Sequence, residues 1–276
     1  MLRLGWFSTA RGKGSQALLK AVQEAIDSRQ LDARIEFVFL SREPGESAAT
    51  DNFISQVKGY DIPLVTHSYR KFKSSQGAPD SQEGGRLARW RLDYDREVID
   101  KLKGFSPDLC ILAGYMLVVG PDMCTRYKML NLHPAAPGGP AGTWMDVIWQ
   151  LIDQRAKETG VMMHLVTPEL DEGPVVSYCK FSIRSRAFDR YWQEIGDRTS
   201  TEIKAAEGEE NTLFKEIRRH GQVRELPLII ATVKAFSQGQ ISIENNQLVD
   251  AGGKPVNGHD LSAVINEKVA AELAEP

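Results

Sequence analysis

Short apolar runs alternate along this chain with longer amphipathic stretches. A uniformly apolar run predicts a strand that is covered on both faces, and apolar residues three or four positions apart predict one face of a helix. Residues 2–8 show the first pattern, and residues 15–28 show the second, with Leu18, Leu19 and Val22 on one face. Repeated alternation of this kind predicts an α/β protein with a mostly parallel, Rossmann-like sheet and helices on both of its faces.

The same patterns predict the remaining elements. Further strands are expected at residues 35–40, 63–66, 109–112, 129–133, 162–166 and 175–183, and further helices at residues 94–102, 212–220 and 227–237 and after an N-cap at Thr143. Residues 240–249 predict a hairpin with Asn245 and Asn246 at its turn, and the tail from residue 259 predicts a helix. Residues 68–85 are polar and predict a surface loop.

One large domain accounts best for this organisation. We expect it to span residues 1–257, with a partly helical, charged insertion at about residues 184–210, followed by a helical tail over residues 258–276. With 276 residues, a net charge of −3 and a pI near 6.0, the chain gives no reason to expect nucleic acid as its main partner. No apolar run reaches the ~20 residues that span a bilayer. Three cysteines without a CxxC pair disfavour a disulfide framework or a structural zinc site, so we expect a cytoplasmic protein, a monomer or a homodimer, with no metal.

Asn131, His133 and Asp171 form the most informative group of polar residues. Asn131 and His133 lie two positions apart in a predicted strand, so their side chains share one face. An amide and a protonated imidazole could donate hydrogen bonds to the oxyanion of an acyl transfer, and a carboxylate could pair with the imidazolium and order a water molecule. Taken alone, Asp171 is better explained as a turn residue before Gly173, and the presence of Asn131 and His133 is what favours a catalytic role.

A glycine-containing loop after the first predicted strand is a second candidate site. Gly12 and Gly14 would let the backbone approach an oxyanion at the start of the following helix. Many strand-to-helix turns carry glycine only for conformational reasons, so the loop by itself leaves both readings open.

These residues occur in segments that resemble the folate-dependent formyltransferases, chiefly the members that act on glycinamide ribonucleotide. The segments are GKGSQ (12–16), PDLCILAGYM (107–116), NLHP (131–134), GVMMHLVT (160–167) and LDEGPVV (170–176). In order and spacing they extend over about three quarters of the chain. The resemblance implies the formyltransferase fold, 10-formyltetrahydrofolate as co-substrate, a phosphorylated amine as acceptor, and Asn131, His133 and Asp171 as the catalytic trio.

The resemblance also assigns binding residues. It implies a substrate phosphate site at Gly12, Lys13, Gly14 and Ser15, and a folate site at Arg91, Met116, Leu117, Val118, Val119, Val166 and Glu169. Several of the apolar residues could equally be core. Arg91 aligns with a basic residue near the folate's glutamate tail, and His164 would support the loop of Asp171 from behind.

Departures from the family pattern leave the acceptor open. Residues 135–146 differ from the usual wall of the amine site, and Gln222 stands where a ribose-binding glutamate is expected. Glycinamide ribonucleotide is the leading acceptor, and an amino sugar nucleotide or hydrolysis of the formyl-folate are the alternatives. The related hydrolases carry a further N-terminal domain, and the amino-sugar enzymes carry a further C-terminal one. We expect neither domain in this chain, which favours glycinamide ribonucleotide as the acceptor. A folate- or phosphate-binding protein without turnover is the alternative from another class.

Overall fold

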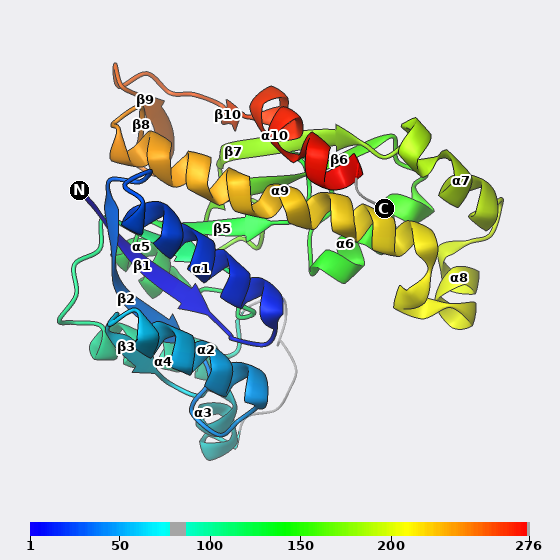
Figure 1. The fold of residues 1–276 in the computed structure, drawn as a ribbon. Coiled ribbons are helices and arrows are strands. Elements are labelled where there is room, and N and C mark those ends of the chain that lie inside the picture. The colour runs from blue at the N-terminus through cyan, green and yellow to red at the C-terminus, as the bar shows by residue number, and fades with distance from the viewer. Residues whose placement is uncertain (78–86, 275–276) are drawn as a thin grey trace.

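A sheet of eight strands forms the centre of the molecule, in the order β10-β7-β6-β5-β4-β1-β2-β3 (Figure 1). The computed structural model describes residues 1–77 and 87–274. Its strands are β1 (Leu2–Ser8), β2 (Ala33–Leu40), β3 (Leu64–Thr66), β4 (Leu109–Leu112), β5 (Met129–His133), β6 (Glu158–Leu165), β7 (Val175–Ser182) and β10 (His259–Asp260). Among them β6 pairs antiparallel with both of its neighbours, and the other pairs in this sheet are parallel. The predicted α/β class and mostly parallel sheet are therefore confirmed.

Helices cover both faces of the sheet (Figure 1). They are α1 (Lys13–Asp27), α2 (Ala48–Gly59), α3 (Tyr69–Ser75), α4 (Arg89–Lys101), α5 (Pro121–Arg126), α6 (Trp144–Asp153), α7 (Arg186–Ile195), α8 (Ser200–Ala206), the 3₁₀ turn η1 (Gly208–Glu210), α9 (Thr212–Ser237) and α10 (Ser262–Ala274). The side chains of neighbouring residues in β1 point to opposite faces of the sheet, because side chains alternate along a strand. Trp6 belongs to the core under α1, α2, α9 and α10, and Phe7 belongs to the core under α3, α4 and α5.

The long helix α9 joins the main sheet to a smaller lobe. Its C-terminal half packs with β6, β7 and α10, and its N-terminal half packs with α6, α7 and α8. The predicted insertion at residues 184–210 is indeed partly helical, and its Phe188, Trp192 and Ile203 are buried in a core shared with α6 and α9. The insertion is thus built into the fold and also supports helix α6, which follows β5 in the chain.

Several predicted boundaries are confirmed by the structure. The strand at 2–8 matches β1, the strand at 109–112 matches β4, and the strand at 129–133 matches β5. Thr143 caps α6 with a full capping box, in which its side chain accepts from the N–H of Asp146 and its own N–H donates to the Asp146 carboxylate. The hairpin β8 (Ile241–Glu244) and β9 (Gln247–Asp250) turns at Asn245 and Asn246, both in the left-handed region with φ of 50° and 59°.

Other predictions are wrong. The expected loop at 68–85 contains helix α3, capped by the side chain of Ser68, and the remainder of that loop from residue 78 lies outside the described residues. The two helices expected at 212–220 and 227–237 are one helix, α9, which continues through Pro227. Proline removes only one of the helix's hydrogen bonds, and residues buried on both sides of it hold the helix together. Helices α2 and α5 had not been predicted.

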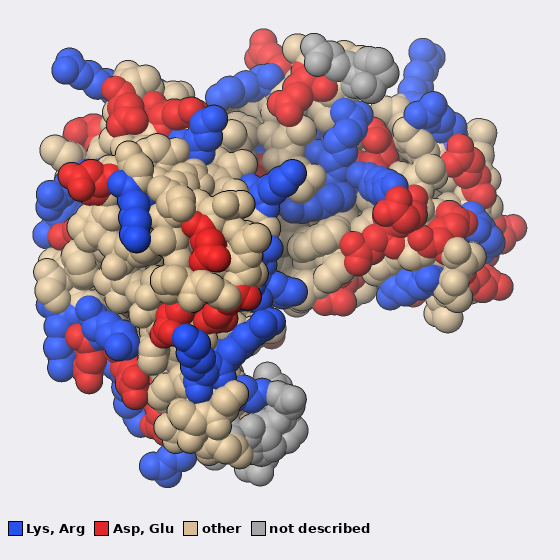
Figure 2. All heavy atoms as spheres, turned by 60° about the horizontal axis from the view of Figure 1, so that its bottom comes forward, with Lys and Arg blue, Asp and Glu red and all other residues tan. Residues whose placement is uncertain are grey.

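Charged residues of both signs are mixed over the surface seen in Figure 2, and a group of Lys and Arg side chains lies beside the hollow between the larger and the smaller part. Cys110, Cys124 and Cys179 are free thiols, as the absence of paired spacing predicted. Among the helices in residues 1–77 and 87–274, none combines the length and the apolar character that crossing a membrane requires.

Candidate active site

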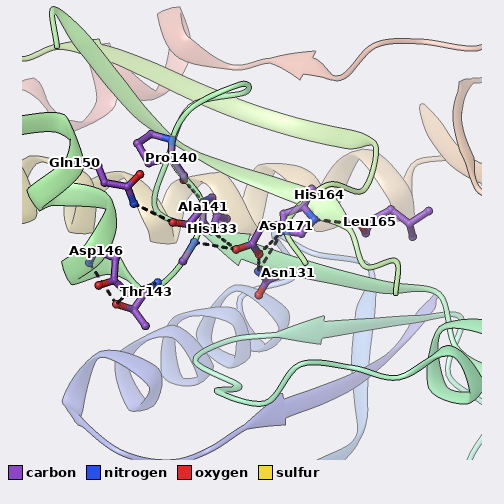
Figure 3. Close-up of polar contacts among 11 residues, drawn as sticks. Asn131, His133, Pro140, Ala141, Thr143, Asp146, Gln150, His164, Leu165 and Asp171 are labelled. Atoms are coloured by element: carbon purple, nitrogen blue, oxygen red, sulfur yellow. Dashed lines mark hydrogen bonds and ion pairs between the residues drawn. The ribbon is translucent and has the colours of Figure 1, made fainter. Parts of the chain in front are cut away.

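The polar cluster predicted from the sequence lies at the carboxyl end of β5 (Figure 3). Asn131 and His133 share one face of this strand, and the antiparallel register places His164 of β6 directly opposite Asn131. The loop after β6 returns Asp171 to the same place, so that its carboxylate points at all three side chains (Figure 3). Residues 131, 133 and 171 are thus brought together, as the trio required.

Asn131 is held by two neighbours. Its Nδ2 lies 3.1 Å from His164 Nε2 and 3.4 Å from Asp171 Oδ1. His164 Nδ1 lies 3.1 Å from the carbonyl of Leu165, which can only accept, so in the neutral imidazole Nδ1 carries the proton and Nε2 accepts from Asn131. In the protonated imidazole Nε2 can instead donate to Asp171 Oδ1, which lies 3.4 Å away. His164 therefore orients the amide directly, in addition to supporting Asp171 as the sequence suggested.

His133 is 2% exposed and is fixed from the other side. Its Nε2 lies 2.9 Å from the carbonyl of Pro140, so Nε2 carries the proton, while Nδ1 lies 3.6 Å from Asp171 Oδ2. Burial lowers the pKa of His133 below its ordinary value, although Pro140 and Asp171 both act in the opposite direction. The electrostatics therefore favour a neutral imidazole at neutral pH, in contrast to the protonated one expected from the sequence.

Asp171 lies in a tight turn with φ of +57°, a left-handed conformation that aspartate tolerates better than most residues. The N–H of Gly142 donates to its Oδ2 at 3.2 Å. Burial by itself would raise the pKa of Asp171, but the contact with His164, the charge that His133 can carry and the Gly142 N–H together hold it below the ordinary value. Asp171 is thus ionised and placed to stabilise a proton on either imidazole.

These groups open into one cavity of about 400 Å³, which reaches from the start of α1 to the loop after β6. Most of the residues expected to bind substrate or co-substrate line it. They are Gly14, Ser15, Met116, Leu117, Val118, Val119, Val166 and Glu169, together with Asn131, His133, His164 and Asp171. The cavity lies where the loops after β1 and β4 diverge, which is the crevice in which open α/β sheets bind their ligands.

Three predicted site residues do not line this cavity. Gly12 is the N-cap of α1, and Lys13 is exposed at the first position of the helix. Arg91 is 5% exposed and donates to the carbonyl of Val118 and to Asp95 on its own helix. Gln222, which the family pattern suggested for the acceptor, also lies outside the lining.

Sequence reasoning missed the contribution of the loop between β5 and α6. This loop supplies the carbonyl of Pro140 to His133 and the N–H of Gly142 to Asp171, so the segment that departs from the family pattern helps to orient two of the central side chains. Gly142 has φ of +111°, which glycine adopts readily. The glycine and proline residues at 137–142 predict an unusual backbone conformation, but they do not indicate that this backbone orients His133 and Asp171.

A second unpredicted group of side chains belongs to the lining of the cavity. Trp144, Arg218 and Glu225 line it, with Arg218 paired to Glu225 at 2.6 Å and stacked over the Trp144 ring. The side chain of Gln222, in its better amide orientation, accepts from Arg218 behind this wall. Although imidazoles and a carboxylate meet nearby, no group of three His, Cys, Asp or Glu side chains in the described part of the chain could hold a metal ion.

A mostly parallel α/β sheet with an amide, two imidazoles and a carboxylate at one strand end defines a protein suited to acyl-group transfer. Comparison with known families makes this specific, because residues 13–200 match the Formyl transferase family. The chain belongs to that family, and the curated proteins that it resembles include both phosphoribosylglycinamide formyltransferases and formyltetrahydrofolate deformylases.

Individual relatives are moderately similar. The phosphoribosylglycinamide formyltransferase of Escherichia coli is 34% identical over 95 residues, which are 34% of this chain and 44% of that protein, so the match spans less than half of the relative. The formyltetrahydrofolate deformylase of Haemophilus influenzae is 30% identical over 88 residues, which are 31% of this chain and 31% of that protein. The structure of a phosphoribosylglycinamide formyltransferase from Coxiella burnetii shares the fold, with a TM-score of 0.64 at 20% identity over 94% of this chain and 98% of that one.

Proposed function

We propose that this protein transfers a formyl group from 10-formyltetrahydrofolate to the primary amine of a phosphorylated substrate, with glycinamide ribonucleotide as the leading acceptor and purine biosynthesis as the setting. One observation carries the proposal. A single cavity is lined by the start of α1, by the apolar segment at 116–119 and, between them, by Asn131, His133 and Asp171. The start of α1 would bind a phosphate, the segment at residues 116–119 would bind a folate, and the three central side chains would act on the atoms that react.

The folate side is supported by the chemistry of its wall. The segment at residues 116–119 follows β4 and offers an apolar surface to a flat ring, and Val166 adds a further apolar residue to the lining. Glu169 lies in the loop before Asp171 and adds a polar edge. An apolar wall with a few convergent polar groups is the usual composition of a cofactor site.

The phosphate side is supported by the start of α1. Gly12, the N-cap of this helix, has no side chain to accept from the first helical N–H groups. Gly14 and Ser15 line the cavity at this end, so N–H groups and the positive end of the helix dipole are available to an anion. Lys13 is exposed beside them and would add charge without being part of the lining.

The central residues then have distinct roles. The folate would supply an activated formyl group, and the Asn131 amide would donate to the formyl oxygen as the amine attacks the carbon. One proton must leave the amine and one must reach the departing folate nitrogen. His133 has only one N–H when neutral, and Pro140 takes it, so Nδ1 is the atom that can accept the amine's proton. Asp171, 3.6 Å away, would stabilise the imidazolium before that proton is passed on.

Hydrolysis of the formyl-folate is the second candidate, because the chain is also related to formyltetrahydrofolate deformylases. In that case water would replace the amine. The deciding experiment incubates the protein with 10-formyltetrahydrofolate, with and without glycinamide ribonucleotide, and follows the absorbance change as tetrahydrofolate forms. Turnover that depends on the ribonucleotide is expected. Equal turnover without it would indicate the hydrolase, and none in either case would turn attention to other phosphorylated amines or to a binding role.

A further inference from the structure

A buried ion pair lies behind the apolar segment at 116–119. Arg91 and Asp95 occupy one turn of α4, their Nη2 and Oδ1 atoms are 2.6 Å apart, and their side chains are 6% and 1% exposed. Burying two charges requires good geometry and further hydrogen bonds, so such a pair adds little stability compared with an apolar pair of the same size. Its position in the fold suggests a use other than stability.

Both members of the pair hold the main chain of the neighbouring segment. Arg91 donates to the carbonyl of Val118 from Nε at 3.1 Å and from Nη2 at 2.7 Å. Asp95 Oδ2 accepts from the N–H of Gly120 at 2.7 Å. The ion pair therefore fixes a peptide group on each side of Val119, whose side chain packs into the core at this point.

The fit around this contact is close. A Cβ atom at Gly120 would lie 2.8 Å from Asp95 Oδ2 and 3.0 Å from Leu92 Cδ2, so a residue larger than glycine would fit here only if the segment or α4 shifted. The Arg91 guanidinium also lies over the Tyr94 ring, 5.2 Å from its centroid, which restrains the plane of its fork. The contact between the Arg91–Asp95 pair and residues 118–120 is thus restrained both on α4 and on the segment.

We propose that Arg91 and Asp95 are positioning residues for the formyl donor: they fix residues 118–120 so that the wall at 116–119 presents a preformed surface to the pterin ring. The inference rests on the proposed function, since it assigns this wall to the folate. It differs from the sequence-based assignment of Arg91 to the folate's glutamate tail, because here Arg91 acts through the main chain and touches no part of the ligand.

The two roles are separated by a ligand that lacks the tail. Tetrahydrofolate and tetrahydropteroate share the pterin ring and the benzoyl group, and only the first carries glutamate. Calorimetric titration would give both dissociation constants for the wild type, Arg91→Lys and Asp95→Asn. Lysine has a single ammonium group and cannot hold Val118 and Asp95 with the same fork. We expect about tenfold weaker binding of both ligands, as loss of a hydrogen bond to a charged group implies.

Matched controls exist on the same helix. Arg89 and Asp93 have the same spacing and form an exposed pair, so Arg89→Lys and Asp93→Asn should leave both dissociation constants within about twofold. The KM for the amine acceptor should also stay within about twofold in Arg91→Lys and Asp95→Asn, which a general loss of folding would not allow.

Each other outcome overturns a specific statement. Weaker binding of tetrahydrofolate alone would show that Arg91 contacts the glutamate tail. Unchanged binding of both ligands by Arg91→Lys and Asp95→Asn would show that the Arg91–Asp95 clamp does not position the wall at residues 116–119. A wild-type chain that binds neither ligand would instead overturn the proposed function. In that case faster exchange of the Gly120 amide hydrogen in Asp95→Asn would still report whether the clamp itself exists.

Discussion

Gly173 is the position at which the smallest change should disturb the cluster most. It lies two residues after Asp171, where the chain crosses the end of β6 and the N–H of Leu165 donates to Pro174. A Cβ atom added at Gly173 would lie 1.7 Å from the carbonyl oxygen of Leu165 and 2.9 Å from its carbonyl carbon. Real Cβ atoms do not approach closer than 3.0 Å, so Gly173→Ala must move the turn that carries Asp171 by more than about 1 Å.

The expected loss follows from that displacement. A misplacement of about 1 Å in a catalytic group can cost about 100-fold in rate, or about 2.7 kcal/mol in the activation free energy. In the formyl-transfer assay, kcat/KM of Gly173→Ala should fall by about that factor, and the midpoint of urea unfolding should fall as well. Gly104→Ala is the control, because nothing lies within 4 Å of its Cβ and its φ is not positive. Wild-type kcat/KM in Gly173→Ala would refute the link between this close approach and the position of Asp171.

Three further outcomes are expected. Asn131→Ala and Asp171→Ala should each lower kcat by about 100-fold or more while circular dichroism stays unchanged, and normal turnover in either would remove that residue from the mechanism. Burial lowers the pKa of His220 from its ordinary 6.5 to about 4, so the unfolded chain binds more protons between these values. The free energy of unfolding in urea should therefore fall as the pH drops from 6.5 toward 4, and His220→Gln should reduce that fall. Phe188→Ala removes a fully buried ring from the insertion and should cost about 3–5 kcal/mol in a single unfolding transition, against about 0.5 kcal/mol or less for the exposed Val264→Ala.

The sheet and part of the cluster could be predicted because local rules and the fold agree there. The segment around Asn131 and His133 is apolar on both sides, so strand β5 was expected, and alternation along a strand then fixes both side chains on one face. Asp171 is different, since it lies in a turn 38 positions beyond His133. Its turn-forming composition explains its conformation, with φ of +57°, and only the family resemblance suggested that it returns to β5.

Predictions failed where distant packing outweighs a local signal. Pro227 is a strong indication of a helix end, yet α9 continues through it, because side chains such as Ile217 and Val233 are buried on either side of the break that the sequence suggests. Arg91 failed to reach the cavity for a similar reason. A charged residue near a binding segment suggests a ligand contact, and here the structure provides a buried partner in Asp95 and a carbonyl at Val118 instead.

The place of His164 shows which kind of information the sequence lacked. The sequence predicts a strand at residues 162–166 that contains His164, but it does not say which strand is the neighbour or in which direction that neighbour runs. In the structure β6 runs against β5, and the pairing of Asn131 with His164 follows from that direction. Directly opposed residues in an antiparallel pair have Cβ atoms within about 5.5 Å, which is why an imidazole can hold the Asn131 amide at 3.1 Å. The reversal of one strand in a mostly parallel sheet therefore supplies the orientation of the residue proposed to bind the formyl oxygen.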